Sequence, residues 1–221
     1  MDLLFPKRAG PFDNVEDRAW FFQGSAPSSK TTAGVGVNEE TSLNLPAWWC
    51  GCRVLCEAVM SLPCLTYRRG KDDHRETAND HWLFDLLWRQ PNPDMPAGPF
   101  VEGRMLHQIN YGNGFAEIEW DNPNPMRRSQ VIALWPIHAG RVRRILPRYQ
   151  DKADYDAGYR YSVRNDDNSR TLLKADETLH VPGIFPEDGI WGKSCVQYHR
   201  EAIGFGQGVE RYGSSFFGTG G

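Results

Sequence analysis

The first strongly periodic segment of the chain lies between residues 46 and 62. Apolar residues recur there three or four positions apart, which places them on one face of an α-helix. Pro46 suits the first helical turn, where its missing N–H is not needed, and Pro63 disfavours a helical conformation at the residue before it. We therefore predict a helix that begins at Pro46 and ends before Pro63, with these residues on its apolar face: Trp48, Cys52, Leu55, Val59 and Leu62.

Two more helices are predicted from the same spacing. Asn79 or Asp80 can cap the first of them, and Gly112-Asn113-Gly114, which tolerate positive φ angles, end the second. The elements predicted between residues 64 and 111 are a strand at Cys64–Tyr67, a charged turn at Arg68–Asp73, a helix at 80–88 and a helix at 96–111.

After residue 114 the apolar residues recur every second position. Ala116, Ile118 and Trp120 alternate with two glutamates, as in a half-buried strand. A polar turn at Asn165–Asn168 separates two of the later segments and predicts a hairpin. Because helices come first and strands later, the chain is predicted to be an α+β protein with a mixed or antiparallel sheet. The predicted strands are 115–120, 131–135 (ended by Pro136), 141–145, 159–163, 171–173 and 178–181.

The last segment is predicted to be a long helix, from about Ser194 to Phe217. Ser194 and Gln197 match a capping box, but the several glycines that follow each cost about 1 kcal/mol relative to alanine. The helix therefore needs packing, either within the chain or against a second copy. Its small and apolar positions at spacings of four and three form a predicted packing seam: Cys195, His199, Ala202, Gly206, Val209, Gly213 and Phe216.

Residues before the first helix show no sustained period. The run Gly24–Asn44 is rich in Gly, Ser and Thr and indicates a flexible arm, which is interrupted upstream by the aromatic residues Trp20-Phe21-Phe22. We assign residues 1–40 to this arm, 41–190 to the α+β domain and 191–221 to the last helix.

Composition narrows the function classes. The 221 residues include 25 Lys and Arg against 28 Asp and Glu, with 40% hydrophobic residues, which excludes a wholly disordered chain and disfavours nucleic-acid binding through overall charge. No run is long enough to span a membrane, and no secretory signal is visible, so the expected compartment is the cytoplasm. Four close cysteines, Cys50, Cys52, Cys56 and Cys64, lack zinc-site spacing and are interpreted as buried free cysteines that act as small apolar residues.

One stretch is strongly basic. Between Met126 and Lys152 there are seven basic residues and one acid, Asp151. Phosphate binding is one interpretation. A solvated sheet face whose cations pair with the nearby acids Asp154, Asp156, Asp166 and Asp167 is the other. The arginines of this basic patch are Arg127, Arg128, Arg141, Arg143, Arg144 and Arg148.

No catalytic constellation is apparent. The six histidines form no metal-binding pair at helical spacing, and the chain contains no nucleophile elbow, P-loop or dinucleotide fingerprint. Glu187 and Asp188, with a histidine such as His180, are the remaining candidates for a metal-dependent hydrolase, although an exposed turn before Gly189 is the favoured interpretation, since turns favour Asp and Gly. We therefore predict no catalytic residues, metal or cofactor.

The order of segments resembles that of phage portal proteins of the Hong Kong ninety-seven type. The resemblance covers about residues 41–218 and depends on the collinear set, because no single motif is specific. One departure is Gly114, where alanine is more usual in the family. The matching segments are Asn44–Trp49, Arg53–Pro63, Tyr67–Arg69, His81–Leu87, Gln90–Met95, Gly112–Ala116, Leu134–His138, His180–Gly183 and Asp188–Ser194.

The resemblance implies a structural subunit without catalytic activity. Portal proteins form dodecameric rings at one vertex of the capsid, and double-stranded DNA passes through them. The implied partners are the terminase large subunit, a head–tail connector or adaptor, and the major capsid and scaffolding proteins, with no membrane. The implied location is the virion, with assembly in the host cytoplasm. Residues 41–190 then correspond to the wing domain and the last helix to the first stem helix, so that the chain is roughly the N-terminal half.

The resemblance also assigns roles to polar residues of the last helix, which either line the DNA channel or join subunits: Arg200, Glu201, Gln207, Glu210 and Arg211. Two alternatives from other classes remain at this point. One is a non-specific nucleic-acid-binding module that uses the basic patch, and the other is the metal-dependent hydrolase.

Overall fold

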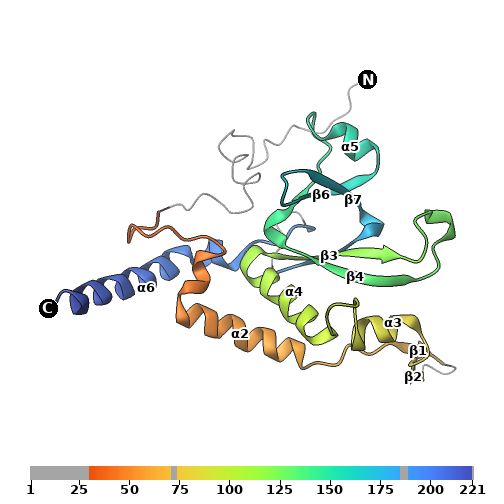
Figure 1. Ribbon diagram of the computed structural model, residues 1–221, viewed down its shortest axis with the longest axis horizontal. Coiled ribbons are helices and arrows are strands. Elements are labelled where there is room, and N and C mark those ends of the chain that lie inside the picture. Colours follow the sequence, from red (N-terminus) through yellow and green to blue (C-terminus); the bar gives the residue numbers. More distant parts are fainter. Residues whose placement is uncertain (1–29, 71–73, 185–188, 221) are drawn as a thin grey trace.

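The computed structural model of the chain describes residues 30–70, 74–184 and 189–220. Three layers make up its body (Figure 1), and one helix projects from it. The helices are η1 (Thr41–Asn44), α2 (Pro46–Met60), α3 (Trp82–Phe84), η3 (Asp85–Arg89), α4 (Ala97–Tyr111), η4 (Pro125–Arg127), η5 (Ala139–Arg141), α5 (Lys152–Asp156), η6 (Ala175–Glu177) and α6 (Cys195–Gly218). The strands are β1 (Tyr67–Arg69), β2 (Arg75–Thr77), β3 (Asn113–Trp120), β4 (Val131–Ile137), β5 (Val142–Arg144), β6 (Tyr159–Arg164), β7 (Arg170–Lys174) and β8 (Thr178–Pro182).

The helices α2 and α4 form the first layer, and both were predicted from the sequence. Pro46 occupies the first turn of α2 as expected, and Ser61 caps its end. The buried thiols Cys52 and Cys56 pack against Ile109 of α4. Gly112 ends α4 with a φ of 78°, a conformation that glycine adopts without strain. These boundaries confirm the predicted positions of both helices. The predicted apolar face of α2 is wrong at Leu55 and Leu62, which are 51% and 68% exposed, because the side that packs on α4 contains Cys56 instead.

The predicted helix at 80–88 differs in detail. His81 caps it, because its Nδ1 accepts the Leu83 N–H at 3.2 Å, whereas Asn79 and Asp80 were the expected caps. After one turn of α-helix in α3 the chain widens into the π-helix η3. Its Leu86 is buried in the core cluster that contains Phe100 and Leu134. The position of the helix was thus predicted correctly, but the change of helix type was not.

Two three-stranded antiparallel sheets form the other layers, with strand orders β4-β3-β8 and β5-β6-β7. The α+β class is confirmed, and each pairing in both sheets is antiparallel. Strand β4 continues past the predicted end, because Pro136 pairs with Ala116 on an edge strand, where a missing N–H is tolerated. The β6–β7 hairpin around residues 165–168 and the strand β8 are also confirmed.

Strand β3 lies at the centre of the core. Its successive side chains point to opposite faces, so it contacts both the helical layer and the second sheet. Ala116 faces the helical layer with Phe100 and Leu134. Phe115, only 1% exposed, faces the second sheet and packs its ring against His180, with 4.6 Å between ring centroids. Farther along β3, Glu117 is exposed. The first half of β3 is therefore buried on both faces, which the alternating pattern of 115–120 did not predict.

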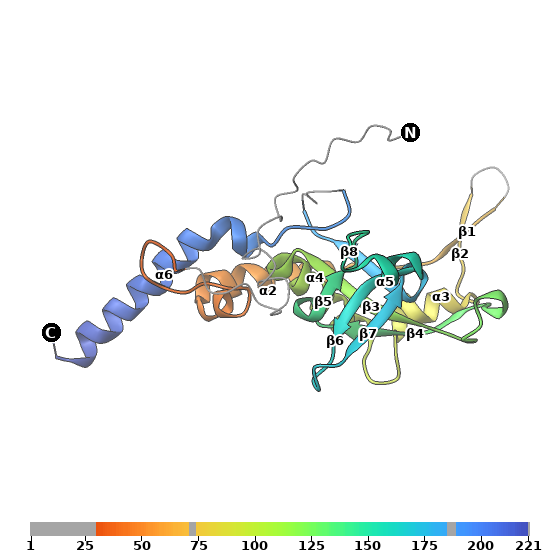
Figure 2. The same cartoon turned by 90° about the horizontal axis from the view of Figure 1, so that it is seen from above.

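The small hairpin β1–β2 corrects the prediction for residues 64–73. The strand is Tyr67–Arg69, and it pairs with Arg75–Thr77 instead of ending in a charged turn. The Gly70 N–H donates to the His74 carbonyl at 2.8 Å and closes the hairpin. All residues of both strands are exposed. Figure 2 shows that this hairpin projects from the body at the end opposite to α6.

Candidate functional site: the projecting helix α6

Helix α6 begins at a cap that the sequence predicts. The Ser194 Oγ accepts the Gln197 N–H at 3.3 Å and donates to the Asn110 carbonyl at the end of α4. The Gln197 amide does not return to the Ser194 backbone, as a complete capping box requires. It instead donates to the Glu39 carboxylate at 3.4 Å. The start of α6 is therefore tied to α4 and to the segment before α2.

Residues 30–45, which we name the strap, are packed against α6. The sequence placed them within or beside a flexible arm, of which residues 1–29 lie outside the described residues. Val35 and Val37 are 3% and 0% exposed and form a core cluster with Val196 and Ile203 of α6. Besides the bond from Gln197 to Glu39, two hydrogen bonds fasten the strap, from Thr32 N to the Glu201 carboxylate at 3.0 Å and from the Gln207 amide to the Thr41 carbonyl at 2.6 Å. The composition of the strap concealed this packing, because its two valines need a partner distant in sequence.

The opposite face of α6 is apolar and exposed. At 3.6 residues per turn, spacings of seven, four, three and four place five side chains on one side of the helix. Phe205 is 67% exposed and Tyr212 is 73% exposed. A helix that is apolar on two opposite faces is normally buried, and within the described residues only one of the two faces of α6 has a partner. We name the exposed face the α6 stripe, and its members are Tyr198, Phe205, Val209, Tyr212 and Phe216.

The predicted packing seam only partly coincides with this stripe. His199, Ala202 and Val209 are exposed, and a Cβ at Gly213 would meet no atom within 4 Å. Gly206 lies near the strap, because a Cβ there would meet Leu45 Cδ1 at 3.0 Å. The close approach that small residues permit occurs instead at Gly204. Packing of the seam against another copy stays a prediction.

The polar residues assigned to the channel or to subunit contacts have different surroundings. Glu201 and the buried Gln207 both bind the strap, so they have structural roles inside the chain. Arg200 is half-buried, and Glu210 and Arg211 are exposed on the projecting part of α6. Contact of these residues with DNA or with a neighbouring subunit remains a prediction.

The basic patch is not one surface of free positive charge. Arg128 lies at the β3–β4 hairpin and forms ion pairs with Asp176 and Glu177, with its side chain only 9% exposed. Arg141 at the end of η5 pairs with Asp166, and Arg143 of β5 pairs with the buried Asp151. The arrangement supports the solvated, ion-paired interpretation, although most of the partner acids differ from those expected. Of the other patch residues, Arg127 and Arg148 are exposed and Arg144 is half-buried.

The other chemical candidates do not form a site. Cys52 and Cys56 are buried as predicted, but the prediction is wrong for Cys50 and Cys64, which are exposed. Burial raises the pKa of the Cys52 thiol to about 11. His180 is engaged by Asn113 and Tyr161 at 2.9 and 3.2 Å, while Glu187 and Asp188 lie outside the described residues. In residues 30–70, 74–184 and 189–220, histidine, cysteine and acidic side chains form no group of three or more that could hold a metal ion.

Asn113 joins β3 to the segment before α6, a role that was not predicted from the sequence. The Asn113 Oδ1 accepts from Gly192 N at 2.8 Å, and its Nδ2 donates to the Gly192 carbonyl at 2.8 Å. The backbones at Gly112 and Gly192 approach so closely that a Cβ at Gly192 would lie 1.9 Å from the Gly112 carbonyl oxygen. Asn113 had been interpreted only as a turn residue, although its place directly before a strand hints at a fixed side chain.

A pair of histidines lies near the junction of α4 and β3: His107 belongs to α4, and His138 directly precedes η5. His107 and His138 pack edge to face with 4.8 Å between ring centroids, and Tyr111 contacts both rings. Burial, followed by the charge of Arg104, lowers the pKa of His107 to about 3. Both imidazoles are held neutral at ordinary pH, since burial also lowers the pKa of His138.

None of the helices that the structure describes combines the length and the apolar character needed to cross a membrane. Comparison with solved structures finds the same fold in parts of a gene transfer agent. The neck of a native particle, computed with C12 symmetry, matches with a TM-score of 0.59 and 16% identity over 81% of this chain and 44% of the other. The neck of an empty particle, computed with C6 symmetry, gives 0.61 and 17% over 81% and 45%.

Comparison with protein sequences is more specific. The probable portal protein of Streptomyces phage phiC31 is 28% identical over 229 aligned residues, which cover 98% of this chain and 47% of that protein. The portal protein of Enterobacteria phage HK97 is 22% identical over 191 residues, or 83% of this chain and 40% of the other. This chain thus spans less than half the length of these two relatives. A family model described as phage portal protein matches residues 46–221, and the chain therefore belongs to the phage portal protein family, whose members are structural proteins and not enzymes.

Proposed function

We propose that this chain supplies the wing domain and the first stem helix of a portal subunit that assembles into a ring at one vertex of the virion. In this proposal residues 41–190 form the wing and residues 191–221 form the stem helix. Double-stranded DNA passes through the centre of the ring during packaging and ejection. The terminase large subunit, a head–tail connector, and the capsid and scaffolding proteins are the proposed partners, and a dodecamer is the proposed copy number.

The observation that carries the proposal is the pair of opposite apolar faces on α6, joined to the family match. One face is covered by the strap, and the α6 stripe is exposed along a helix that projects from the body (Figure 1). Burying one such side chain contributes about 1.5–3 kcal/mol. A contact between two different surfaces of identical subunits forms a closed ring when the rotation that relates neighbouring subunits divides 360° into a whole number of steps. The α6 stripe is thus suited to be one half of such a contact.

The two alternative functions, non-specific nucleic-acid binding and metal-dependent hydrolysis, lose support. Three arginines of the basic patch are ion-paired within the chain, and pairing removes much of the charge that phosphate binding needs. The hydrolase alternative offered His180 as an example of its histidine, and both ring nitrogens of His180 are occupied by structural hydrogen bonds.

A charge placed in the α6 stripe tests the proposal. We expect Val209→Asp in the complete gene product to lower the mass measured by light scattering from that of a ring to that of small species, because a buried unpaired carboxylate is costly. The matched control is Ser214→Asp, which adds the same charge at an exposed position of the same helix on the opposite side. Rings that form equally well with Val209→Asp would contradict a role for the stripe in assembly.

A further inference from the structure

Helix α2 has a second apolar face, which is exposed in the described part of the chain. Its buried thiols Cys52 and Cys56 pack against α4, whereas apolar residues three and four positions apart on another side of the helix are exposed. Val54 is 65% exposed, and Leu62, just past the end of the helix, is 68% exposed. We name this side the α2 outer face, and its members are Ala47, Gly51, Val54, Leu55, Ala58 and Leu62.

The α2 outer face complements the α6 stripe in chemistry and in shape. Neither face includes a charged side chain. The stripe presents four aromatic rings, whereas half of the outer face consists of alanine and glycine, and a Cβ at Gly51 would meet no atom within 4 Å. The side chains of one helix pack into the grooves between the side chains of another, and small residues leave room in those grooves for large rings.

The two faces are also similar in size. At about 1.5 Å per residue, the outer face runs over about 22 Å and the stripe over about 27 Å. The four rings of the stripe are 48–73% exposed, so at about 200 Å² for a whole aromatic side chain they offer on the order of 500 Å². A stable protein contact takes about 800 Å² from each partner. The rings alone therefore account for more than half of the area that such a contact needs.

The two faces do not meet within one chain, because both are exposed in the same structure. They nevertheless belong to the same end of the molecule (Figures 1 and 2), where Leu45 at the start of α2 lies beside Gly206 of α6. Exposed apolar patches mark interaction surfaces. A ring of identical subunits would cover both faces of every copy, whereas a different partner bound to one face would leave the other in water.

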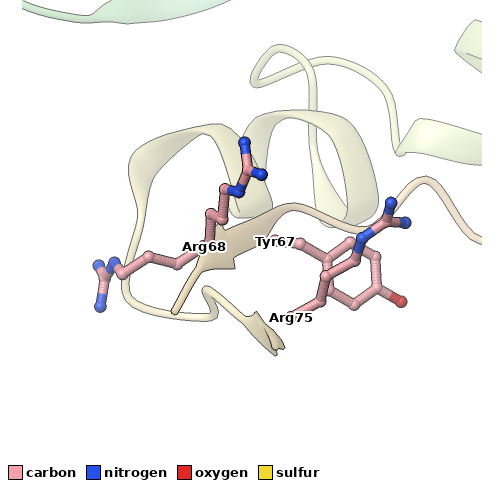
Figure 3. Close-up of a pocket in the computed structure, with 4 residues that line it drawn as sticks. Tyr67, Arg68 and Arg75 are labelled. Carbon is pink, nitrogen blue, oxygen red and sulfur yellow. The ribbon is translucent and has the colours of Figure 1, made fainter. Parts of the chain in front are cut away.

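Other surfaces suit the stripe less well. The cavity of about 450 Å³ that Figure 3 shows is lined by Tyr67, Arg68, Arg69 and Arg75. Burying charged side chains against an apolar face is costly, and this hairpin lies at the end of the molecule opposite to α6. The exposed Met126 and Tyr149 lie in connections between strands or between a strand and a helix, so they form no extended face.

From these features we propose that the α6 stripe of each subunit packs against the α2 outer face of the next subunit. The inference rests on the proposed function, because it supplies the second surface that a ring contact between unlike faces requires. Packing of one stripe against another stripe would be a contact between like surfaces, which joins two copies and goes no further.

A pair of opposite charges in the complete gene product tests the contact. Val54 and Val209 lie near the middle of their faces, so they come close whether the two helices run parallel or antiparallel. We expect Val54→Lys, like Val209→Asp, to lower the fraction of protein in rings by at least about tenfold, because an unpaired charge is then buried. A chain with both substitutions should form at least about tenfold more rings than Val209→Asp alone, because a buried charge with a partner costs less than one without.

The matched control is Asn44→Lys, which adds the same charge at an exposed position before α2 and outside the α2 outer face. It should leave rings intact by itself and should not restore them in combination with Val209→Asp. Light scattering and negative-stain images measure the fraction in rings. A urea unfolding curve checks that the Val54→Lys subunit folds, as we expect for an exposed position.

Rings that survive Val54→Lys but not Val209→Asp would overturn this inference and leave the proposed function standing. Rings that survive both substitutions would contradict both proposals. The inference is also overturned if the double variant stays as disassembled as the two single variants. Unfolding of the Val54→Lys subunit would overturn it as well, since the α2 outer face would then be covered within the subunit.

Discussion

Replacing Gly204 by alanine tests how the strap holds α6. A Cβ at this position would lie 2.4 Å from Cγ2 and 2.5 Å from Oγ1 of Thr31, well inside van der Waals contact. Thr31 is 4% exposed, and its hydroxyl donates to the Val35 carbonyl at 2.9 Å. The threonine therefore cannot turn away without losing that hydrogen bond, and the strap must shift.

The magnitude follows from two opposing effects. Alanine improves helix propensity by about 1 kcal/mol over glycine, and overpacking a well-packed contact costs about 1–3 kcal/mol. Gly213 provides the matched control, because it lies in the same helix and a Cβ there meets nothing within 4 Å. Both substitutions gain the same propensity, so the difference between them isolates the clash. We expect Gly204→Ala to be less stable than Gly213→Ala by about 1–3 kcal/mol.

Urea unfolding of the two variants measures this difference in the free energy of unfolding. Hydrogen exchange adds a local readout, since loosening of the strap should increase exchange at Val35 and Val37 in Gly204→Ala and leave it unchanged in Gly213→Ala. If the two variants unfold at the same urea concentration and exchange alike, the strap does not hold α6 through this contact, and the account of the N-terminal packing is refuted.

Three other perturbations test the junction between the domain and α6. Ser194→Ala should lower the free energy of unfolding by about 1 kcal/mol through loss of the cap, and an unchanged urea midpoint would contradict that role. Asn113→Leu leaves both backbone groups of Gly192 without its amide, so we expect a loss of about 3 kcal/mol or more, and a loss below about 1 kcal/mol would contradict it. The folded pKa of His107 is depressed to about 3 from 6.5, so its stabilising contribution is complete above pH 6.5 and is lost as the pH falls towards 3, by about 1.4 kcal/mol per pH unit. Urea unfolding between pH 7 and pH 4.5 should show this slope, with His138 adding in the same direction, and His107→Gln should flatten it; an equal slope in that variant would contradict the assignment.

The elements that sequence reasoning placed correctly are those specified locally. Helices α2 and α4 carry their own period and their own end signals, so Pro46 and Gly112 mark boundaries that the structure retains. The cap at Ser194 is local in the same sense. Antiparallel hairpins such as β6–β7 are also close in sequence, which is why a polar turn between alternating segments was enough to predict them.

The features that sequence reasoning missed depend on contacts between distant residues. The sequence of the strap predicts a flexible segment, yet the Thr41 carbonyl accepts a hydrogen bond from Gln207, 166 positions away. Arg128 reads as part of a basic patch, yet its acids lie near residue 176. In α6 the small residues suggested a seam, but which glycine permits close approach is decided by the strap, and it is Gly204. The sequence therefore predicted that the candidate site is a helix. Which faces of that helix are buried and which are exposed could be identified only from the three-dimensional structure.

Electron microscopy of the complete gene product tests the central claim most directly. Negative-stain images show whether particles have a central hole, and light scattering of the same sample gives their mass. The account predicts closed rings with a central channel in the unmodified protein and their loss in Val209→Asp. A monodisperse monomer of the unmodified protein, folded and with its α6 stripe exposed, would contradict the proposal that this helix assembles a portal ring.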